Sequence, residues 1–332
     1  MRLLAKHLWV DDHARAEALW GWKHFGSPWG KSRMLIAADA ADNIIGFVAL
    51  MPHRLRVGSQ VIAGFQLADL VVDARYRGQG IGTALFSKIS DSPRGLKNAV
   101  LIAIPNRFSY PLILKQGWHP IDDFYAQIRF SEPFRVALHL ARSRFNVAKQ
   151  YAEEDFFKSG ACVLGARRET SSLLSDSRTC NLIDTDQSCE RNEGLALAKD
   201  VQYLRWRYQD HPAVHYYAVT HETQSQLDAA ILFRTMTTDG LKGIMIVEFL
   251  TTSQVTGREL LEKLYKIVEV DFIAARIGPA SIKREILRES GLKLSRKHLN
   301  IRFLVDQVNW QTAVDLSSSQ NWADSVSSME EL

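Results

Sequence analysis

The hydrophobic and polar residues of the first 130 positions follow two different periods. Apolar runs between short polar turns predict strands, and apolar residues that recur every three or four positions predict helices. In chain order these are a helix at Asp11–Phe25, strands at Arg33–Asp39, Ile44–Met51 and Val61–Val72, a helix at Thr83–Ile89, a strand at Ala99–Ile104, a helix at Leu112–Gln116 and a strand at Phe124–Phe130. This order predicts the α/β class with a mixed sheet, in which three antiparallel strands come first.

A cluster of glycines lies between the third strand and the helix that follows it. The strand ends at Leu70-Val71-Val72, and Gly78, Gly80 and Gly82 follow at alternate positions. A strand end, a glycine-rich turn and a helix start direct several backbone N–H groups and the positive end of a helix dipole at one point. Because glycine has no Cβ, a ligand can approach this backbone closely. The segment therefore predicts a phosphate-binding turn.

The spacing of these glycines distinguishes between the known kinds of phosphate loop. A P-loop needs a lysine directly after its second glycine, and the first lysine after this cluster is Lys88. A dinucleotide-binding loop needs a third glycine where Thr83 stands. The pattern that fits is Arg-x-x-Gly-x-Gly, formed by Arg77, Gly80 and Gly82. It resembles the pyrophosphate loop of the GCN5-related N-acetyltransferase (GNAT) superfamily, whose members bind acyl-coenzyme A.

A second segment carries the same resemblance. The sequence from Pro105 to Trp118 contains Asn106 and ends in Gly117-Trp118, and it is similar to the Asn…Gly-aromatic signature that follows the fifth GNAT strand. The order of the predicted elements also resembles the GNAT fold nearly from end to end. The resemblance implies a GNAT domain at residues 1–130, with acetyl-CoA or another acyl-CoA as co-substrate.

The second half of the chain repeats the pattern of the first. Trp22-Lys23-His24, with Pro28 four residues on, recurs as Trp206-Arg207-Tyr208 with Pro212. The predicted elements then recur in the same order: strands at His215–His221, Ala229–Met236 and Gly243–Thr251, a helix at Arg258–Val268, a strand at Asp271–Ile277 and a helix at Ile282–Gly291. The same order of elements twice predicts a tandem repeat.

The second copy lacks the glycine cluster, and its corresponding segment contains one glycine, Gly257. We therefore expect a degenerate GNAT-like domain at residues 191–312 that binds no pyrophosphate. Between the domains, residues 131–190 are expected to form a helical or irregular connector, with a helix at Pro133–Tyr151 and partial disorder at Arg168–Arg178. Residues 313–332 are expected to form a flexible tail, serine-rich and acidic from Ser317 onward.

The resemblance implies roles for residues of the first domain. The fourth and fifth strands of a GNAT domain splay apart, and the pantetheine arm pairs with exposed backbone, here that of Leu70, Val71 and Val72. A backbone N–H near Leu70 would also stabilise the oxyanion of the tetrahedral intermediate. The residues expected to hold the pyrophosphate are Arg77, Gly78, Gln79, Gly80, Ile81, Gly82 and Thr83. Asn106 matches an asparagine that contacts the cofactor arm or the acceptor side.

The acid and the base depart from the family pattern. Ile113 stands where many members have the tyrosine that protonates the leaving thiolate. Tyr110, one helical turn earlier, is a candidate acid, and packing is the alternative role. Asp69, at the inner end of the strand Val61–Val72 (the fourth strand in GNAT numbering), is a candidate base if burial raises its pKa; alternatively it caps a turn or bonds to the neighbouring strand. Glu248 is a further candidate if the acceptor cleft runs between the domains. Scattered histidines, including His24, match no ligand spacing.

Composition narrows the class of protein. A length of 332 residues favours two domains, and a net charge of +4 from 41 basic and 37 acidic residues is too mild to indicate nucleic-acid binding. The three cysteines, Cys162, Cys180 and Cys189, have no Cys-x-x-Cys spacing, so we expect neither a disulfide framework nor a metal site. With no apparent signal peptide or membrane span, the expected location is the cytoplasm. The sequence predicts no oligomeric state.

The expected activity is transfer of an acetyl or other short acyl group from acyl-CoA to a primary amine of a small molecule, for which an amino sugar is the preferred candidate. The amine would attack directly in a ternary complex. Two alternatives remain open. One is an aminoacyl-tRNA-dependent transferase, since such enzymes also have tandem GNAT-like domains. The other is a non-catalytic acyl-CoA-binding or regulatory protein, which the isoleucine at position 113 suggests.

Overall fold

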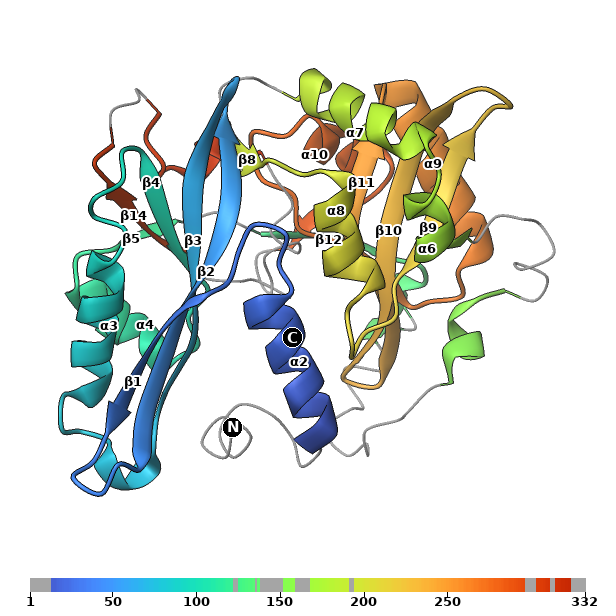
Figure 1. Ribbon diagram of the computed structural model, residues 1–332. Coiled ribbons are helices and arrows are strands. Elements are labelled where there is room, and N and C mark those ends of the chain that lie inside the picture. The colour runs from blue at the N-terminus through green and yellow to red at the C-terminus, as the bar shows by residue number, and fades with distance from the viewer. Residues whose placement is uncertain are drawn as a thin grey trace. The chain divides into compact units, whose positions relative to one another are not determined.

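A computed structural model describes residues 13–121, 125–134, 136–137, 152–158, 168–190, 194–295, 303–310 and 314–323. The chain forms two compact units, and each is built around a seven-stranded mixed sheet (Figure 1). Unit 1 consists of Met1–Asp123, Glu193–Ala213 and Ile301–Asn321, and unit 2 consists of Phe124–Asn192, Val214–Asn300 and Trp322–Leu332. The predicted fold class is confirmed.

Unit 1 contains nearly every element predicted for the first copy. In chain order its elements are α2 His13–Phe25, β1 Arg33–Ala38, β2 Ile44–Val57, β3 Gln60–Val72, η1 Ala74–Tyr76, α3 Ile81–Asp91, β4 Ala99–Ala103, α4 Ser109–Lys115, β5 His119–Ile121, β8 Leu195–Leu197, α8 Val201–Leu204, the π-helical turn η4 Arg205–Gln209, β14 Phe303–Val308 and η5 Ser319–Asn321. The strand order is β1-β2-β3-β4-β14-β5, and β8 pairs with β2. Only the β3–β4 pairing is parallel among the described strand pairs of this sheet.

The core of unit 1 follows from the alternation of side chains along its strands. Val48 and Leu50 of β2 point to the face on which Leu85, Phe86 and Ile89 of α3 pack. All five residues of β4 are buried, as expected of a central strand whose two faces are both covered. α3 is therefore fixed against the sheet along its apolar side, and its N-terminus lies at the end of β3.

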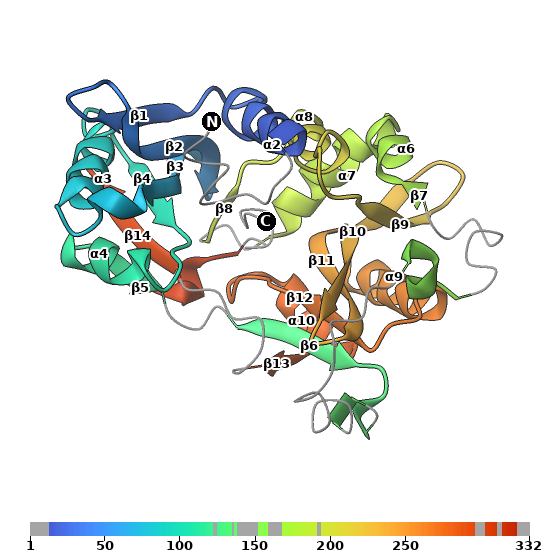
Figure 2. The same ribbon diagram turned by 90° about the horizontal axis from the view of Figure 1, so that it is seen from below.

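Unit 2 contains the elements predicted for the second copy, together with others from the connector. In chain order they are β6 Ala126–Phe130, η3 Glu153–Phe156, β7 Arg168–Glu169, α6 Thr170–Leu174, α7 Arg178–Cys189, β9 Tyr217–Glu222, β10 Leu227–Thr238, β11 Leu241–Thr251, α9 Gln254–Ile267, β12 Phe272–Ala275, α10 Lys283–Glu289 and β13 Lys293–Ser295. The strand order is β13-β6-β12-β11-β10-β9-β7. As in unit 1, the one parallel pair among the described strands joins two central strands, here β11 and β12 (Figure 2).

The two sheets exchange one strand each, which the sequence did not predict. β6, expected to complete the first domain, pairs antiparallel with β12 and β13 in unit 2. β14, from the end of the second copy, pairs antiparallel with β4 and β5 in unit 1. The units thus differ from the contiguous domains expected at residues 1–130 and 191–312. Both strands are short and mix apolar with polar residues, so the local pattern predicts a strand in each case but does not specify the partner strand.

The internal repeat is visible in a reciprocal contact within unit 1. Trp22 Nε1 donates to the Trp206 carbonyl oxygen at 2.7 Å, and Trp206 Nε1 donates to the Trp22 carbonyl oxygen at 2.9 Å. The two rings stack with their centroids 5.0 Å apart. A reciprocal contact, in which two equivalent residues donate the same hydrogen bond to each other, is characteristic of two-fold symmetry. The alignment of the two tryptophan triplets therefore has a structural counterpart.

Two expectations of disorder differ from the structure. The segment Arg168–Arg178 contains β7 and α6, because Leu173 and Leu174 are buried and hold it in place. In the expected tail, Trp322 is 2% exposed, and its carbonyl oxygen accepts a hydrogen bond from Ala280 N at 2.9 Å. Most of the helix predicted at Pro133–Tyr151 lies outside the described residues. Within the described ranges, no helix is long and apolar enough to cross a membrane.

Candidate active site

The glycine cluster forms a turn with an open helix N-terminus. β3 ends at Val72 and α3 begins at Ile81. Gly78 and Gly80 have φ angles of 78° and 81°, the left-handed region that glycine adopts without strain. Gly80 is the N-cap residue of α3, and among the described residues no side chain caps this helix. Its first-turn N–H groups are thus directed at the exposed side of the turn, where they can bind an anion.

The turn is braced by polar contacts on the side of the sheet. The buried carboxylate of Asp73 accepts a hydrogen bond from Arg75 N at 3.0 Å and caps η1. Tyr76 Oη donates to Asp39 Oδ2 at 3.0 Å, which ties the turn to the end of β1. Arg77 Nε donates to the Val72 carbonyl oxygen at 3.0 Å, so the guanidinium lies at the entry of the glycine turn. These contacts tie the glycine turn to the ends of β1 and β3.

The strands that precede the turn separate in the way that the resemblance implies. The parallel pairing of β3 with β4 runs from Gly64 opposite Val100 to Leu67 opposite Ala103 and ends there. β3 continues to Val72 and stays paired with β2 on its other edge. The edge of Leu70–Val72 that faces β4 consequently has no strand partner among the described residues. This edge can pair with an extended ligand, apart from the Val72 carbonyl oxygen, which already accepts from Arg77 Nε.

Asp69 lies at the bulge where the two strands separate. On β3, three steps lead from Ala68 to Val71, whereas their partners Ala49 and Phe47 are two steps apart on β2. The extra residue kinks the strand, and Asp69 has a φ of 53°, which is unusual for a residue with a side chain. The position predicted for the base is therefore a special backbone site.

The protonation expected for Asp69 is corrected by its contacts. Burial by itself raises the pKa of this carboxyl, but the charge of Lys23 and a hydrogen bond from His24 outweigh burial and lower the pKa below its usual value. Lys23 Nζ lies 2.8 Å from Oδ1, and His24 Nε2 lies 2.8 Å from Oδ2. Asp69 is thus an ionised carboxylate with one hydrogen-bond donor on each oxygen. It lacks the raised pKa that would suit a general base.

Ile113 and Tyr110 both contribute to packing against the core of unit 1. Ile113 is 1% exposed and lies in the cluster that also contains Phe86 of α3. Tyr110, half-buried, packs against the same cluster. Asp69, in contrast, bonds to α2, whose Trp20 packs against Phe47 on the opposite face of β2. The two predicted catalytic residues thus contact different elements of unit 1.

Asn106 has a local role that the sequence analysis did not anticipate. Its Oδ1 accepts hydrogen bonds from the backbone N–H groups of Phe108 and Ser109 at 2.9 and 3.0 Å. An asparagine that bonds to the backbone two and three residues ahead initiates the turn that leads into a helix, which is α4 in this protein. This capping explains an asparagine at this position without a ligand.

Three residues around Asp69 were missed: Lys23, His24 and Ser32. The two strongly buried basic residues come from the last turn of α2, and Ser32 lies just before β1. Residue spacing could not identify Lys23 and His24, because their common partner, Asp69, is more than 40 positions away. The one available signal was that Lys23 and His24 belong to the repeated aromatic-basic-aromatic triplet.

The corresponding region of unit 2 is closed. β11 ends at Thr251 and α9 begins at Gln254, so only two residues connect them. Ser253 caps α9, its side chain accepting from Thr256 N at 3.2 Å. Asp186 of α7 accepts from Thr251 N at 2.8 Å, and Lys283 Nζ lies 2.8 Å from the other oxygen of this carboxylate. Side chains of the chain itself thus occupy the backbone donors at this strand end.

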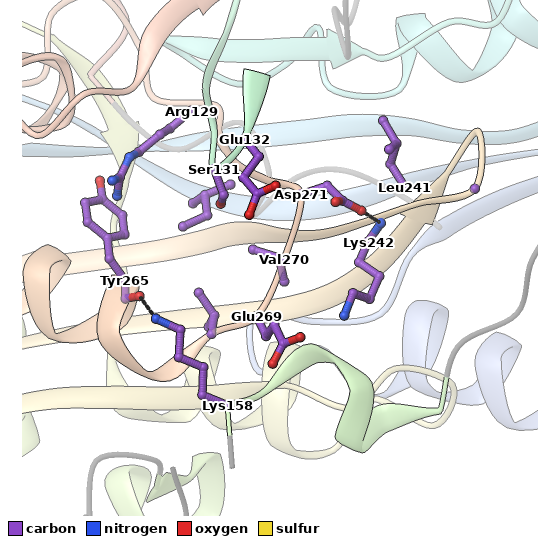
Figure 3. A pocket seen from close by; sticks show the side chains of 13 residues that line it. Arg129, Ser131, Glu132, Lys158, Leu241, Lys242, Tyr265, Glu269, Val270 and Asp271 are labelled. Carbon is purple, nitrogen blue, oxygen red and sulfur yellow. Dashed lines mark hydrogen bonds between the residues drawn. The ribbon is translucent and has the colours of Figure 1, made fainter. Parts of the chain in front are cut away.

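A pocket of about 740 Å³ lies elsewhere in unit 2 (Figure 3). It is found at the starts of β11 and β12, the end of these strands opposite to the one that follows Thr251. Two of its lysines already donate to main-chain oxygens: Lys158 to Tyr265 at 3.3 Å and Lys242 to Asp155 at 2.6 Å. Its mixed acidic and basic lining does not resemble an anion site, and we place the candidate active site at the glycine turn of unit 1.

Comparison with known families decides the identity of this region. Residues 30–127, which contain the glycine turn and the splayed strands, match the family of acetyltransferase (GNAT) domains. The chain carries a GNAT acetyltransferase domain. The predicted membership in this superfamily is thereby confirmed. No curated protein matches the sequence.

Solved structures are similar to this chain over almost its whole length. A GCN5-related N-acetyltransferase from Anabaena variabilis ATCC 29413 has 13% identity and a TM-score of 0.60, covering 93% of this chain and 69% of that one. One from Kribbella flavida has 15% identity and a TM-score of 0.56, covering 93% and 68%. Saccharomyces cerevisiae N-myristoyltransferase with bound myristoyl-CoA has 11% identity and a TM-score of 0.54, covering 97% and 78%. At these identities the likeness shows the fold, and it supports two GNAT-like domains.

Proposed function

We propose that the protein is an acyl-CoA-dependent N-acyltransferase whose first GNAT domain transfers an acetyl or other short acyl group to a primary amine of a small molecule. The observation that carries this proposal is the open N-terminus of α3 beside an unpaired strand edge. Gly78 and Gly80 supply the left-handed turn, and Leu70–Val72 supply the edge. An anion site next to an extended backbone groove matches a ligand with a diphosphate at one end of an amide-containing arm.

In this proposal different residues bind different parts of the acyl-CoA donor. The N–H groups from Gly78 to Thr83 hold the pyrophosphate, and Arg77 adds positive charge at the entry of the turn. The edge of Leu70–Val72 pairs with the amides of the pantetheine arm, which brings the thioester towards the bulge at Asp69. Asn106, whose side-chain oxygen caps α4, contributes to the rim of the site through the position of that helix.

The chemistry requires little beyond alignment, because a thioester is already activated. The amine nitrogen attacks the thioester carbonyl carbon, a backbone N–H near Leu70 stabilises the oxyanion, and the carbon–sulfur bond then breaks. The amine passes a proton to solvent water, and the coenzyme A thiolate gains one from solvent, either directly or through Tyr110. Since the carboxylate of Asp69 is held by two donors, it is better suited to shaping the site than to accepting the proton.

The acceptor class in this proposal is an amino sugar or a related small amine. The test is a panel in which purified protein receives acetyl-CoA with amino sugars, polyamines or amino acids, and release of free thiol is followed. Because one solved neighbour is bound to myristoyl-CoA, the donors include a long-chain acyl-CoA. We expect acetyl-CoA to raise the melting temperature and one class of amine to accelerate thiol release. If no acyl-CoA raises the melting temperature, the donor assignment is wrong.

A non-catalytic acyl-CoA-binding protein is the second candidate, and the buried isoleucine at position 113 favours it. Where many relatives place a proton donor, this chain has an apolar side chain inside the core. A clear thermal shift together with no thiol release from any amine supports this candidate over the transferase.

A further inference from the structure

The carboxylate of Asp69 is held by two residues at the C-terminal end of α2. Lys23 and His24 are consecutive residues in the last turn of α2, and each binds a different oxygen of the carboxylate at 2.8 Å. The side chains of Lys23, His24 and Asp69 are 9%, 0% and 4% exposed. Hydrogen bonds between charged groups are stronger than neutral ones, and burial shields these from water.

The imidazole of His24 is also fixed at its other end. Nδ1 lies 3.0 Å from Ser32 Oγ, and Ser32 N donates to the His24 carbonyl oxygen at 2.9 Å. The ring packs against Trp20, with the centroids 4.3 Å apart. Because a carboxylate only accepts, Nε2 carries the hydrogen towards Asp69, and Nδ1 is the nitrogen that faces Ser32. The ring cannot turn away from Asp69 without breaking its contacts on both sides.

These contacts hold a residue, Asp69, whose backbone conformation is strained. A left-handed conformation is unfavourable for a residue with a Cβ, though less so for aspartate, and Asp69 adopts it with a φ of 53°. Such conformations persist where the surroundings hold them, and they concentrate at functional sites. At this position the bulge turns Leu70–Val72 out of the pairing that ends at Leu67. The direction of these backbone groups thus depends on the conformation of Asp69.

We propose that Lys23 and His24 are positioning residues of the transfer site: by holding the Asp69 carboxylate they fix the strand bulge that aims the Leu70–Val72 backbone at the acyl donor. The inference rests on the proposed function and gives α2 a part in donor alignment. It also gives Asp69 the role of an anchor, whose two oxygens are both committed to donors from α2.

The test compares His24→Gln with His24→Leu in the full chain. The glutamine amide still donates to Asp69 but does not titrate, whereas leucine removes the donor. Glu17→Gln, at an exposed position of the same helix, is the control. We expect His24→Leu to lower kcat by about 10- to 100-fold, as small misplacements of reacting groups do, with the dissociation constant for coenzyme A changed by no more than about threefold. His24→Gln should stay within about threefold of the wild type.

A second readout is hydrogen–deuterium exchange of peptides that cover residues 66–73. Exchange should increase in His24→Leu and not in His24→Gln or Glu17→Gln, because only the first releases the bulge. This measurement needs no activity. It therefore still tests whether His24 holds Asp69 and the bulge if the wild-type protein transfers no acyl group and the proposed function fails. Unchanged exchange and unchanged kcat in a folded His24→Leu protein overturn the inference.

Two further outcomes are covered. Equal loss of kcat in the glutamine and leucine variants, with loss of one limb of the pH profile, would make His24 a proton carrier and overturn the positioning role. If His24→Leu does not fold, the pair Lys23→Arg and Lys23→Met repeats the comparison at the edge of the buried group. Lys23→Arg keeps the charge and should behave as the wild type, and Lys23→Met should reproduce the kcat loss and the faster exchange.

Discussion

Asp69 and His53 of unit 1 both have buried side chains, but their hydrogen-bond partners differ in charge. Asp69 has two basic partners, so it stays ionised although burial opposes charge. His53 has a neutral partner, Gln66, whose Oε1 accepts from Nε2 at 3.0 Å, and in the described part of the chain nothing bonds to Nδ1. Burial, followed by the charge of Arg207, lowers the pKa of His53 from 6.5 to about 4. His53 is therefore neutral in the folded protein at physiological pH.

This difference predicts how stability depends on pH. A histidine whose pKa is lower in the folded than in the unfolded state stabilises the protein fully above pH 6.5, and this stabilisation is lost as pH falls from 6.5 towards about 4. At pH 5 the loss should be about 2 kcal/mol. His53→Gln keeps a hydrogen-bonding amide and removes the titration. Urea unfolding at pH 7 and pH 5 measures both proteins, and parallel losses in the two would contradict the prediction.

At the scale of elements, the two strand-to-helix connections explain why one copy is proposed to bind the donor. In unit 1, eight residues between β3 and α3 form the glycine turn, and α3 starts without a side-chain cap. In unit 2 the connection is short, and Ser253 satisfies the start of α9. A capped helix start has used part of its capacity to bind an anion.

Substitution within the turn tests this difference. Gly80→Ala places a Cβ where no described atom lies within 4 Å, so packing is unaffected, but the φ of 81° becomes strained. We expect acetyl-CoA binding to weaken by about tenfold or more, which corresponds to about 1.4 kcal/mol. Gly95→Ala is the matched control, because its Cβ also meets nothing within 4 Å and its φ is not in the left-handed region. Calorimetric titration measures both, and equal affinities would argue against the turn as the pyrophosphate site.

Periodicity and turn chemistry predicted most of the elements of both copies, because these features are local. The glycine turn was predicted from Gly78, Gly80 and Gly82, and the first two have left-handed conformations that glycine alone adopts easily. The partners of Asp69 were not predicted, because an ion pair between residues 23 and 69 has no trace in the spacing of either segment. The capping role of Asn106 was accessible in principle, as it depends on residues two and three positions ahead.

At the scale of the whole molecule, the least predictable feature is the exchange of β6 and β14 between the sheets. A strand pattern specifies alternation and length but leaves the neighbouring strand open. Both exchanged strands contain buried residues, Ile128 in β6 and Val305 in β14. Each of these pairs with a residue of a fully buried strand, Ile128 with Ala274 and Val305 with Ile102.

Two matched substitutions test the exchange in the full chain. Val305→Asp places a charge in β14 and should increase hydrogen exchange in β4, with little effect on β12. Ile128→Asp in β6 should do the reverse. A buried unpaired charge costs several kcal/mol in proteins, so the effect should be large enough to measure. If Val305→Asp instead deprotects β12, β14 belongs to the second sheet, as the domain expected at residues 191–312 implies.

The exchanged strand β14 also affects the synthesis of the protein on the ribosome. The edge of β4 that pairs with β14 is complete at Ala103, but its partner begins at Phe303. At about 5–20 residues per second, the nascent chain carries this apolar edge unpaired for roughly 10 to 40 seconds. An uncovered strand edge is a site of aggregation. The first sheet, whose strand β3 leads into the glycine turn, is therefore completed only after β14 has been synthesised, and the yield of folded protein in a cell should depend on chaperones that cover nascent strands.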